Sequence, residues 1–257
     1  MTAAATDTAA PVRARRPLVR RSFQFLCVLL CLVFLTLGSW QVQRRQWKLA
    51  LIARTNERVH ASPVAPPASD TWQQINAADF EYRHLTLRGH WLAPACLIHT
   101  QALTELGSGF WQLQPLEVAD GSVIWINQGF VPTPQAARAA TAAFQGTGLL
   151  RISEPGGSLL RKNEAQAGHW YSRDIAAITA HCGLPPERTA PYFVDMDASA
   201  AAASAAGAAP QYPVPGLTVI QFHNSHAVYA ITWVVLALMV AWAAWRIGRP
   251  DAELTAE

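Results

Sequence analysis

Two uncharged apolar runs near the ends of this 257-residue chain constrain its fold most strongly. They cover residues 23–40 and 227–245, and each has about the length of a helix that crosses a bilayer core. A segment in hydrocarbon must satisfy its own backbone polar groups, which a helix does. Between the runs lie roughly 180 residues, enough for one domain with its own core. We therefore expect two transmembrane helices that flank one domain.

The first run has a rival interpretation as a cleaved signal peptide, because five arginines precede it. However, the run is longer than the usual apolar region of about 7 to 15 residues. No small-residue cleavage motif follows it; Trp40, Arg44 and Arg45 follow instead. An uncleaved membrane anchor is the better interpretation.

The basic residues around the helices predict the orientation. Five precede the first helix and five follow it, and Arg246 and Arg249 give the terminal side seven against five. Long loops cross membranes with little regard to their charge, so the excess of basic residues on the terminal side predicts the orientation of the two helices. We expect a multi-pass protein of the bacterial cell inner membrane, with both termini cytoplasmic and the large domain periplasmic.

The region between the helices has the pattern of a strand-rich domain. Seven segments alternate or are rich in aromatic and branched residues, and Gly, Pro or Asp bounds them. They cover residues 83–88, 95–101, 109–118, 123–131, 148–153, 191–195 and 216–222. The Ala-Asp-Gly-Ser link at 119–122 predicts a hairpin. Because short links favour antiparallel pairing, we expect an antiparallel β-rich domain of the α+β class, barrel-like or sandwich-like.

Two short helices are expected beside these strands. Residues 134–144 open with a proline, which suits a first helical turn, and continue with alanines. Residues 174–182 begin at Asp174, a favourable N-cap, and stop before Gly183. Alternation in the first predicted strand stops at Gly89.

Composition divides the chain into eight segments. They are a basic cytoplasmic tail (1–21), transmembrane helix 1 (22–42), a juxtamembrane segment with a Pro-rich linker (43–69), the β-rich periplasmic domain (70–197), an Ala/Ser-rich insertion (198–215), the domain's final strand (216–223), transmembrane helix 2 (224–246) and a cytoplasmic tail (247–257). The alanine tract has nothing to bury, so we assign it no role.

Four cysteines raise a metal or redox interpretation. Cys27 and Cys31 have a C-x-x-x-C spacing, but they lie inside the first apolar run, where a thiolate is poorly solvated. We expect them to pack as small hydrophobic residues on one helix face. Cys96 and Cys182 lie in the predicted periplasmic domain, and the sequence alone leaves open whether they pair.

Motifs of soluble enzyme chemistry are absent from the sequence. It contains no G-x-S-x-G, H-E-x-x-H, Walker or dinucleotide fingerprint, and no C-x-x-C-H of covalent haem attachment. The seventeen carboxylates are scattered, and we expect Asp195 and Asp197, the closest pair in a predicted strand, to be solvated strand-end residues. The pattern favours a protein that is not an enzyme. We expect it to contact the lipid bilayer and not to bind nucleic acid.

Several motifs occur in a fixed order along the chain. They are residues 37–41 with Arg44, Trp47 and Lys48; Tyr82-Arg83-His84 before Gly89; residues 109–115 with 123–132; and Asn224-Ser225-His226 with Tyr229, Ala230, Thr232 and Trp233. In these segments the chain resembles the surfeit locus protein 1 family, two-helix membrane proteins that assist assembly of haem-copper cytochrome oxidases. Two residues depart from the family pattern: Gln128, where an arginine is common, and Ser225, which replaces a second asparagine.

The resemblance implies an assembly factor that is not an enzyme. It would act as a chaperone on oxidase subunit I while haem a is inserted, with the haem a synthesis enzyme as a second partner. His226 matches the histidine that the family favours as a haem ligand, and haem a would be bound transiently. A neutral imidazole is a good axial ligand for haem iron. Two alternatives remain: a scaffold that stabilises subunit I without haem, and, with less support, a membrane-anchored hydrolase.

Helical spacing places His226, Tyr229 and Trp233 on one face as one wall of a haem pocket. Gly38 would allow close approach from the first helix, and Arg44 and Arg45 are expected to pair with the propionates. The aromatic and basic residues also fit a membrane-interface belt, and His226 also fits a structural hydrogen bond.

His223 lies three residues before His226 and raises an H-x-x-H metal site. Two ligands are too few for a closed site, which commonly needs four. We therefore expect His223 to end the strand that leads into the membrane.

Overall fold

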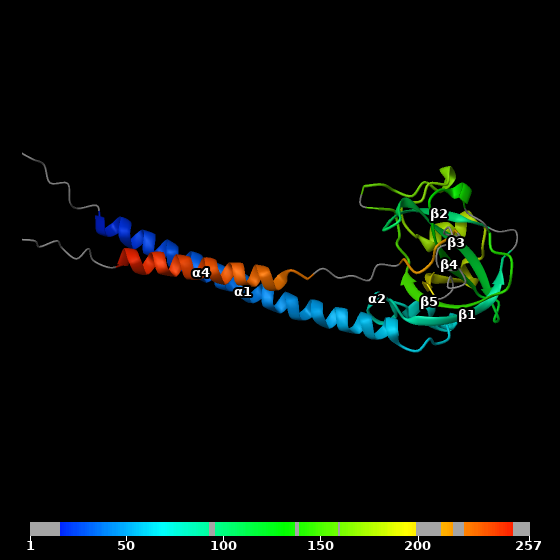
Figure 1. Cartoon of the computed structure of the whole chain (residues 1–257), viewed down its shortest axis with the longest axis horizontal. Helices are drawn as coiled ribbons and strands as arrows, with labels where there is room; N and C mark the ends of the chain where they lie inside the picture. The colour runs from blue at the N-terminus through cyan, green and yellow to red at the C-terminus, as the bar shows by residue number, and fades with distance from the viewer. Residues whose placement is uncertain are drawn as a thin grey trace, which may run out of the picture. The chain divides into compact units, whose positions relative to one another are not determined.

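The computed structural model describes residues 16–92, 96–136, 139–158, 160–198, 212–217 and 224–248. It forms two compact units, shown in Figure 1. One is helical and lies within residues 1–52 and 222–257; the other is β-rich and lies within residues 53–221.

The described residues of the helical unit form two long helices. Helix α1 spans Arg16–His60 and helix α4 spans His226–Gly248, and both are long and apolar enough to cross a membrane. The apolar run at 23–40 lies inside α1, which continues through polar sequence to His60. The juxtamembrane segment therefore begins as helix, and residues 53–60 of α1 belong to the β-rich unit.

The buried and half-buried residues of each helix recur alternately every four and three positions. We call this stripe the seam; it comprises Gln24, Cys27, Cys31, Phe34, Gly38 and Gln41 on α1, and His226, Ala230, Trp233, Ala237 and Val240 on α4. This repeat is typical of helices that supercoil around each other. Contacts across the seam run in opposite directions along the two helices, since Phe34 stacks on Trp233 whereas Cys31 Sγ approaches the Ala237 carbonyl oxygen. The pair is therefore antiparallel.

The described part of the β-rich unit contains six strands. They are β1 (His84–Trp91), β2 (Ile98–Thr104), β3 (Gly107–Val118), β4 (Val123–Val131), β5 (Phe144–Ile152) and β6 (Thr189–Met196). Their order in the sheet is β1-β5-β6-β4-β3-β2, and a further pairing of β1 with β3 closes five of them into a barrel. The described short helices are α2 (Ala77–Phe80), α3 (Ile175–His181) and the 3-10 turns η1 (Ser69–Gln74), η2 (Pro134–Ala136), η3 (Ala165–Ala167) and η4 (Pro186–Arg188).

Strand β3 both closes the barrel and extends it. One edge pairs with β4. The other edge pairs with β2 over residues 107–113 and with β1 over residues 116–118. Pro115 lies between the two stretches, and its carbonyl accepts a hydrogen bond from the Leu92 amide. The β2–β3 ribbon therefore projects beyond the barrel.

Residues that alternate along the strands fill two separate cores. Leu116, Ile124, Ile126 and Tyr192 belong to the cluster that all five barrel strands share. The outward residues, among them Leu113, Trp125 and Phe193, pack under α3 instead. Because both of its faces are covered, β4 is buried along its whole length.

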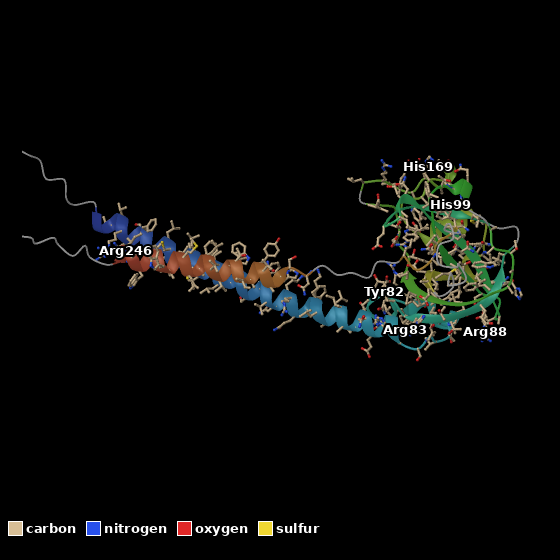
Figure 2. The ribbon with its side chains drawn as sticks, in the orientation of Figure 1. Tyr82, Arg83, Arg88, His99, His169 and Arg246 are labelled. Atoms are coloured by element: carbon tan, nitrogen blue, oxygen red, sulfur yellow. A yellow bond between two sulfur atoms is a disulfide. The ribbon has the colours of Figure 1, made fainter. Side chains whose placement is uncertain are left out.

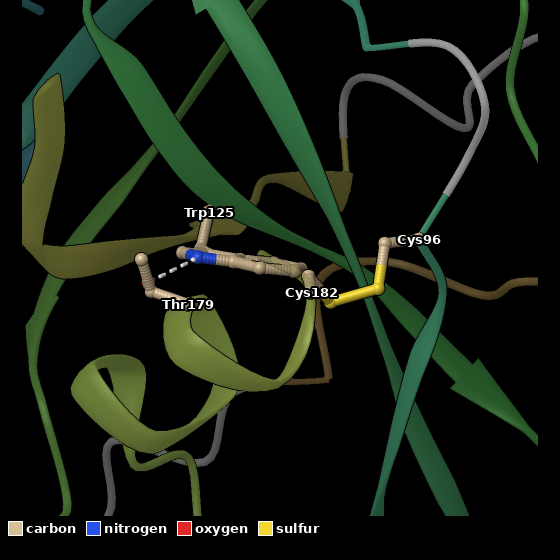
Figure 3. The surroundings of a disulfide bond; sticks show 4 residues. All are labelled: Cys96, Trp125, Thr179 and Cys182. Carbon is tan, nitrogen blue, oxygen red and sulfur yellow. Dashed lines mark hydrogen bonds between the residues drawn. A yellow bond between two sulfur atoms is a disulfide. The ribbon is translucent and has the colours of Figure 1, made fainter. Parts of the chain in front are cut away.

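A disulfide closes the second core. Cys96 and Cys182 are bonded, with their Cα atoms 6.1 Å apart, and Cys182 is the C-cap of α3 (Figure 3). Trp125 Nε1 donates a hydrogen bond to Thr179 Oγ1 at 3.0 Å in the same region. Asp174 caps the other end of α3 by accepting from the Ala177 amide, as predicted.

Three expectations about the strands and helices are corrected. The helix predicted over 134–144 is a single turn at Pro134–Ala136, and β5 begins at Phe144. Alanine-rich sequence lacks an apolar stripe to bury, and Gln114 binds both backbone groups of Ala140 instead. Strand β1 continues past Gly89 to Trp91 because these residues pair with β3. The pairing of β4 with β6 is parallel and not antiparallel as expected, because the long connection through β5 and α3 returns the chain to β4 in the same direction.

The predicted Pro-rich linker is partly bound to the barrel. Val64 pairs with Leu85 of β1: its amide donates to His84, and its carbonyl accepts from Thr86. The strand predicted over 216–222 falls largely outside the described residues, as does nearly all of the alanine tract. Val214, just before that strand, bridges to Phe130 of β4.

Asp195 is buried rather than solvated, which corrects the expectation for this strand end. Its carboxylate lies 2.9 Å from Arg151 Nη1 and accepts a hydrogen bond from Asn127 Nδ2 at 2.7 Å. Arg151 also binds Glu81 at 2.7 Å. A buried carboxylate needs such partners, so this cluster is structural.

Candidate functional site

His226 is the first residue of α4 and is half-buried. Its Nδ1 lies 2.8 Å from Oε1 of Gln41 on α1. An amide oxygen only accepts hydrogen bonds, so Nδ1 carries the hydrogen in this pair. In a neutral ring the lone pair then lies on Nε2. The contact thus orients the imidazole and leaves one nitrogen able to bind a metal.

Gln41 was not predicted as a site residue. It ends the motif at residues 37–41 and lies three positions after Gly38 on the seam. The stripe of Cys27, Cys31, Phe34 and Gly38 is the signal that points to it, because the same four-and-three spacing continues to Gln41.

Trp233 and Gly38 meet where the two helices approach each other. A Cβ at Gly38 would lie 3.6 Å from the Trp233 Cβ and 3.8 Å from the Ala230 carbonyl oxygen. The Trp233 ring stacks on Phe34 with ring centroids 5.7 Å apart. The predicted close approach at Gly38 is therefore filled by α4 itself, and this close contact lies between the Phe34–Trp233 pair and the His226–Gln41 pair.

The other predicted site residues are more exposed. Tyr229 is 55% exposed and lies off the seam of α4. The Arg44 guanidinium lies 4.1 Å from the centre of the Trp47 ring, and Arg45 is exposed. Arg45 follows Gln41 by four residues, so it extends the same face of α1 by one turn. Of the two arginines, it is the one in phase with His226.

The residues before His226 add one unusual group. The Asn224 side-chain oxygen is buried without a hydrogen-bond partner among the described residues. Buried polar atoms normally have partners, so this oxygen has capacity for a donor. His223 lies outside the described residues, and the described part of the chain contains no cluster of three His, Cys, Asp or Glu residues suited to a metal. Cys27, which is 5% exposed, packs in the seam as expected.

The matched motifs of the β-rich unit have structural roles. His84 joins the Ala61 carbonyl at 3.0 Å to Asp197 at 2.7 Å, and Arg83 stacks on Phe80. Gln128, where the family commonly has arginine, is 5% exposed and belongs to a chain of buried amides. It accepts from Gln112 and donates to Gln114. A neutral amide chain accounts for glutamine at this place.

A hollow of about 540 Å³ opens beside the β2–β3 ribbon. Its lining residues are Gln101, Ala102, Leu103, Ser108, Gly109, Phe110, Pro132, Ser158 and Tyr171. His99 on β2 packs edge-on against Phe110, and burial lowers the pKa of its ring. Figure 2 shows His99 and His169 on the opposite side of the β-rich unit from Tyr82 and Arg83. The lining contains no charged side chain, which suits apolar contact better than acid and base chemistry.

Comparison with known proteins places these motifs in one family. The SURF1 family model matches residues 28–238. Surfeit locus protein 1 of Mus musculus is 30% identical over 218 residues, covering 77% of this chain and 66% of the mouse protein. The Homo sapiens protein of the same name is 28% identical over 242 residues, covering 83% and 73%. A SURF1-like protein of Monosiga brevicollis is 29% identical over 214 residues, covering 77% and 76%. The chain belongs to the SURF1 family.

Proposed function

We propose that this protein is an assembly factor for a haem-copper terminal oxidase, and that it assists delivery of haem a to subunit I at the membrane. Membership of the SURF1 family supports the role in assembly. The single observation that supports haem handling is the His226–Gln41 pair, which presents Nε2 of a half-buried imidazole at the start of a membrane-length helix.

The residues around His226 fit a haem as cargo. A neutral imidazole is the side chain that most often binds haem iron, and here a hydrogen bond orients it. The exposed faces of α1 and α4 are apolar, with Leu35, Val228 and Ile231 among them, as a porphyrin face requires. Haem a supplies an iron that takes an axial nitrogen ligand and propionates that take cations.

Each of the predicted residues has a separate task in this proposal. His226 binds the iron and Arg45 pairs with a propionate, with Arg44 held on Trp47 as a second cation. Tyr229 and Trp233 contact the ring from α4. The bond between Gln41 and His226 joins the two helices at this level, so the site exists only while the helices are paired.

The proposed compartment follows from charge and from the disulfide. The basic residues favour cytoplasmic termini in a bacterial inner membrane and a periplasmic domain. The Cys96–Cys182 bond agrees, because disulfides persist in oxidising compartments such as the periplasm. Subunit I is the proposed partner within the membrane, and the haem a synthesis enzyme is the proposed donor. The protein carries out no reaction of its own in this proposal.

The alternative is a scaffold that holds subunit I without haem. The two functions separate when the protein is produced with the enzymes of haem a synthesis and its absorption spectrum is recorded after purification. Haem delivery predicts a haem a spectrum in the wild type that His226→Ala abolishes. His90→Ala is the matched control, since His90 is exposed on β1, and it should retain haem. If the wild type copurifies with subunit I and never carries haem, the scaffold is the correct function.

A further inference from the structure

We infer that Gln41 is the positioning residue of this site: its amide oxygen holds His226 in the tautomer with hydrogen on Nδ1 and fixes the direction of Nε2. The inference rests on the proposed function, in which His226 binds haem iron. It adds a second residue whose task is separate from binding, and it assigns that task to a contact 2.8 Å long between side chains 185 positions apart.

The place of Gln41 in the seam is the first argument. From Cys27 to Gly38 the α1 side of the seam is apolar or small, and the corresponding residues of α4 are Ala230, Trp233 and Ala237. A glutamine that is half-buried against another helix loses water and needs a partner. His226 is the partner that the structure provides. The Gln41–His226 pair is thus a polar layer at the end of a stretch of apolar and small layers.

The chemistry of imidazole is the second argument. A neutral ring has one protonated and one unprotonated nitrogen, and the hydrogen bond of one nitrogen decides the state of the other. Without an acceptor at Nδ1, the ring is free to carry its hydrogen on Nε2, where it blocks metal binding. Partners of this kind typically change metal affinity by about 10- to 100-fold.

The α1 sequence contains two matched controls. Gln43 and Gln46 have the same side chain two and five residues further along the helix, and both are exposed. Neither lies on the seam. A loss of helix propensity or of a polar group in general would therefore affect Gln43→Leu as much as Gln41→Leu, whereas a loss of positioning would affect Gln41→Leu alone.

The first measurement needs no haem. The full-length protein is labelled with ¹⁵N-histidine, placed in lipid nanodiscs, and its ring nitrogens are recorded in a two-bond ¹H–¹⁵N correlation spectrum, with His226→Ala identifying the resonance. We expect hydrogen on Nδ1 of His226 in the wild type and in Gln43→Leu. In Gln41→Leu we expect a mixture of tautomers. The same tautomer in all three proteins overturns the inference.

The second measurement titrates the haem-free protein in nanodiscs with haem a. We expect Gln41→Leu to bind about 10- to 100-fold more weakly and Gln43→Leu to bind as the wild type does. In Gln41→Glu the carboxylate is a stronger hydrogen-bond acceptor for Nδ1, which makes Nε2 a better electron-pair donor to iron. Haem bound to this variant should therefore have a more negative midpoint potential than haem bound to the wild type. This variant also keeps the test decisive if Gln41→Leu does not fold.

The two proposals fail in different ways. If the wild type holds the Nδ1 tautomer but binds no haem, the proposed function fails. The inference fails with it, because Gln41 then positions no ligand. If His226 is required for haem and all Gln41 variants bind equally with unchanged potential, haem delivery survives and the inference alone is refuted.

Discussion

Removing the Cys96–Cys182 disulfide should destabilise the β-rich unit by several kcal/mol. The bond links residues 86 positions apart and joins the chain before β2 to the end of α3. Restricting a loop of this length in the unfolded chain corresponds to about 4.6 kcal/mol, and measured losses for native disulfides fall between about 2 and 5 kcal/mol. Trp125, Trp170 and Phe193 also pack against one another in the buried cluster under α3, so we expect the same fold at lower stability.

The assay is urea unfolding of the full chain in detergent, followed by near-ultraviolet circular dichroism. The double variant Cys96→Ala with Cys182→Ala should lose about 4 kcal/mol, and reductant should produce the same change in the wild type. Cys27→Ala with Cys31→Ala is the control, because these cysteines lie in the helical unit and should leave this transition unchanged. A loss below about 1 kcal/mol, or a wild type that is indifferent to reductant, refutes the loop-entropy argument.

Three further predictions concern single sites. Tyr192→Phe should change the free energy of unfolding by less than about 1 kcal/mol, measured by urea unfolding, because the buried hydroxyl has no partner among the described residues. Burial works to raise the pKa of Glu154, but the hydrogen bond and charge of Arg173 lower it overall. The Glu154–Arg173 pair therefore stabilises the fold at pH values above the pKa of an ordinary glutamate, and this stabilisation is lost as the pH falls through the lowered pKa of the folded state. Glu154→Gln should make the melting temperature less dependent on pH in the acid range. Gly38→Ala should leave the helix pair intact whereas Gly38→Leu should separate it, as crosslinking of cysteines introduced into α1 and α4 would report.

The sequence predicts most strands because their signal is local. Strand β4 has aromatic or branched residues at six of its nine positions and lies between Gly121 and Pro132, and it is found at the predicted bounds. The hairpin at 119–122 follows from Asp120 and Gly121, and Gly121 has the positive φ of 77° that such a turn requires. These features need no knowledge of distant residues.

The predictions that the structure corrects have a common physical cause: each depended on partners that are distant in the sequence. Residues 134–144 have helix propensity, but Gln114 captures the Ala140 backbone from another strand. The parallel pairing of β4 with β6 depends on where α3 packs, and the burial of Asp195 depends on Arg151 and Asn127. Local pattern carries none of this information, because tertiary contacts override propensity.

The candidate site shows the same division. His226 and Trp233 were predicted from motif and helical phase, and both lie on the seam. Tyr229 shares their approximate phase at three residues from His226, yet the helix turns it out to 55% exposure. Gln41 was missed because its partner lies 185 residues away, although its phase with Gly38 was visible. The helical phase in the sequence predicts which residues lie on the face that meets the other helix. Which residues contact each other across that face is known only once both helices are in place.

The motif at residues 37–41 and the motif at residues 224–226 form one structure across the helix pair. Residues 37–41 end with Gln41, and the motif that begins at Asn224 ends with His226; the two final residues are joined by a single hydrogen bond. From Cys27 to Gly38 on α1 the seam next to this bond is apolar or small, so a shift of either helix by one turn would leave an amide and an imidazole without partners. The bond therefore sets the register of the helix pair as well as the direction of Nε2. If His226 binds haem as proposed, its binding also reports whether the helices are correctly paired, because the ring is oriented only when they are.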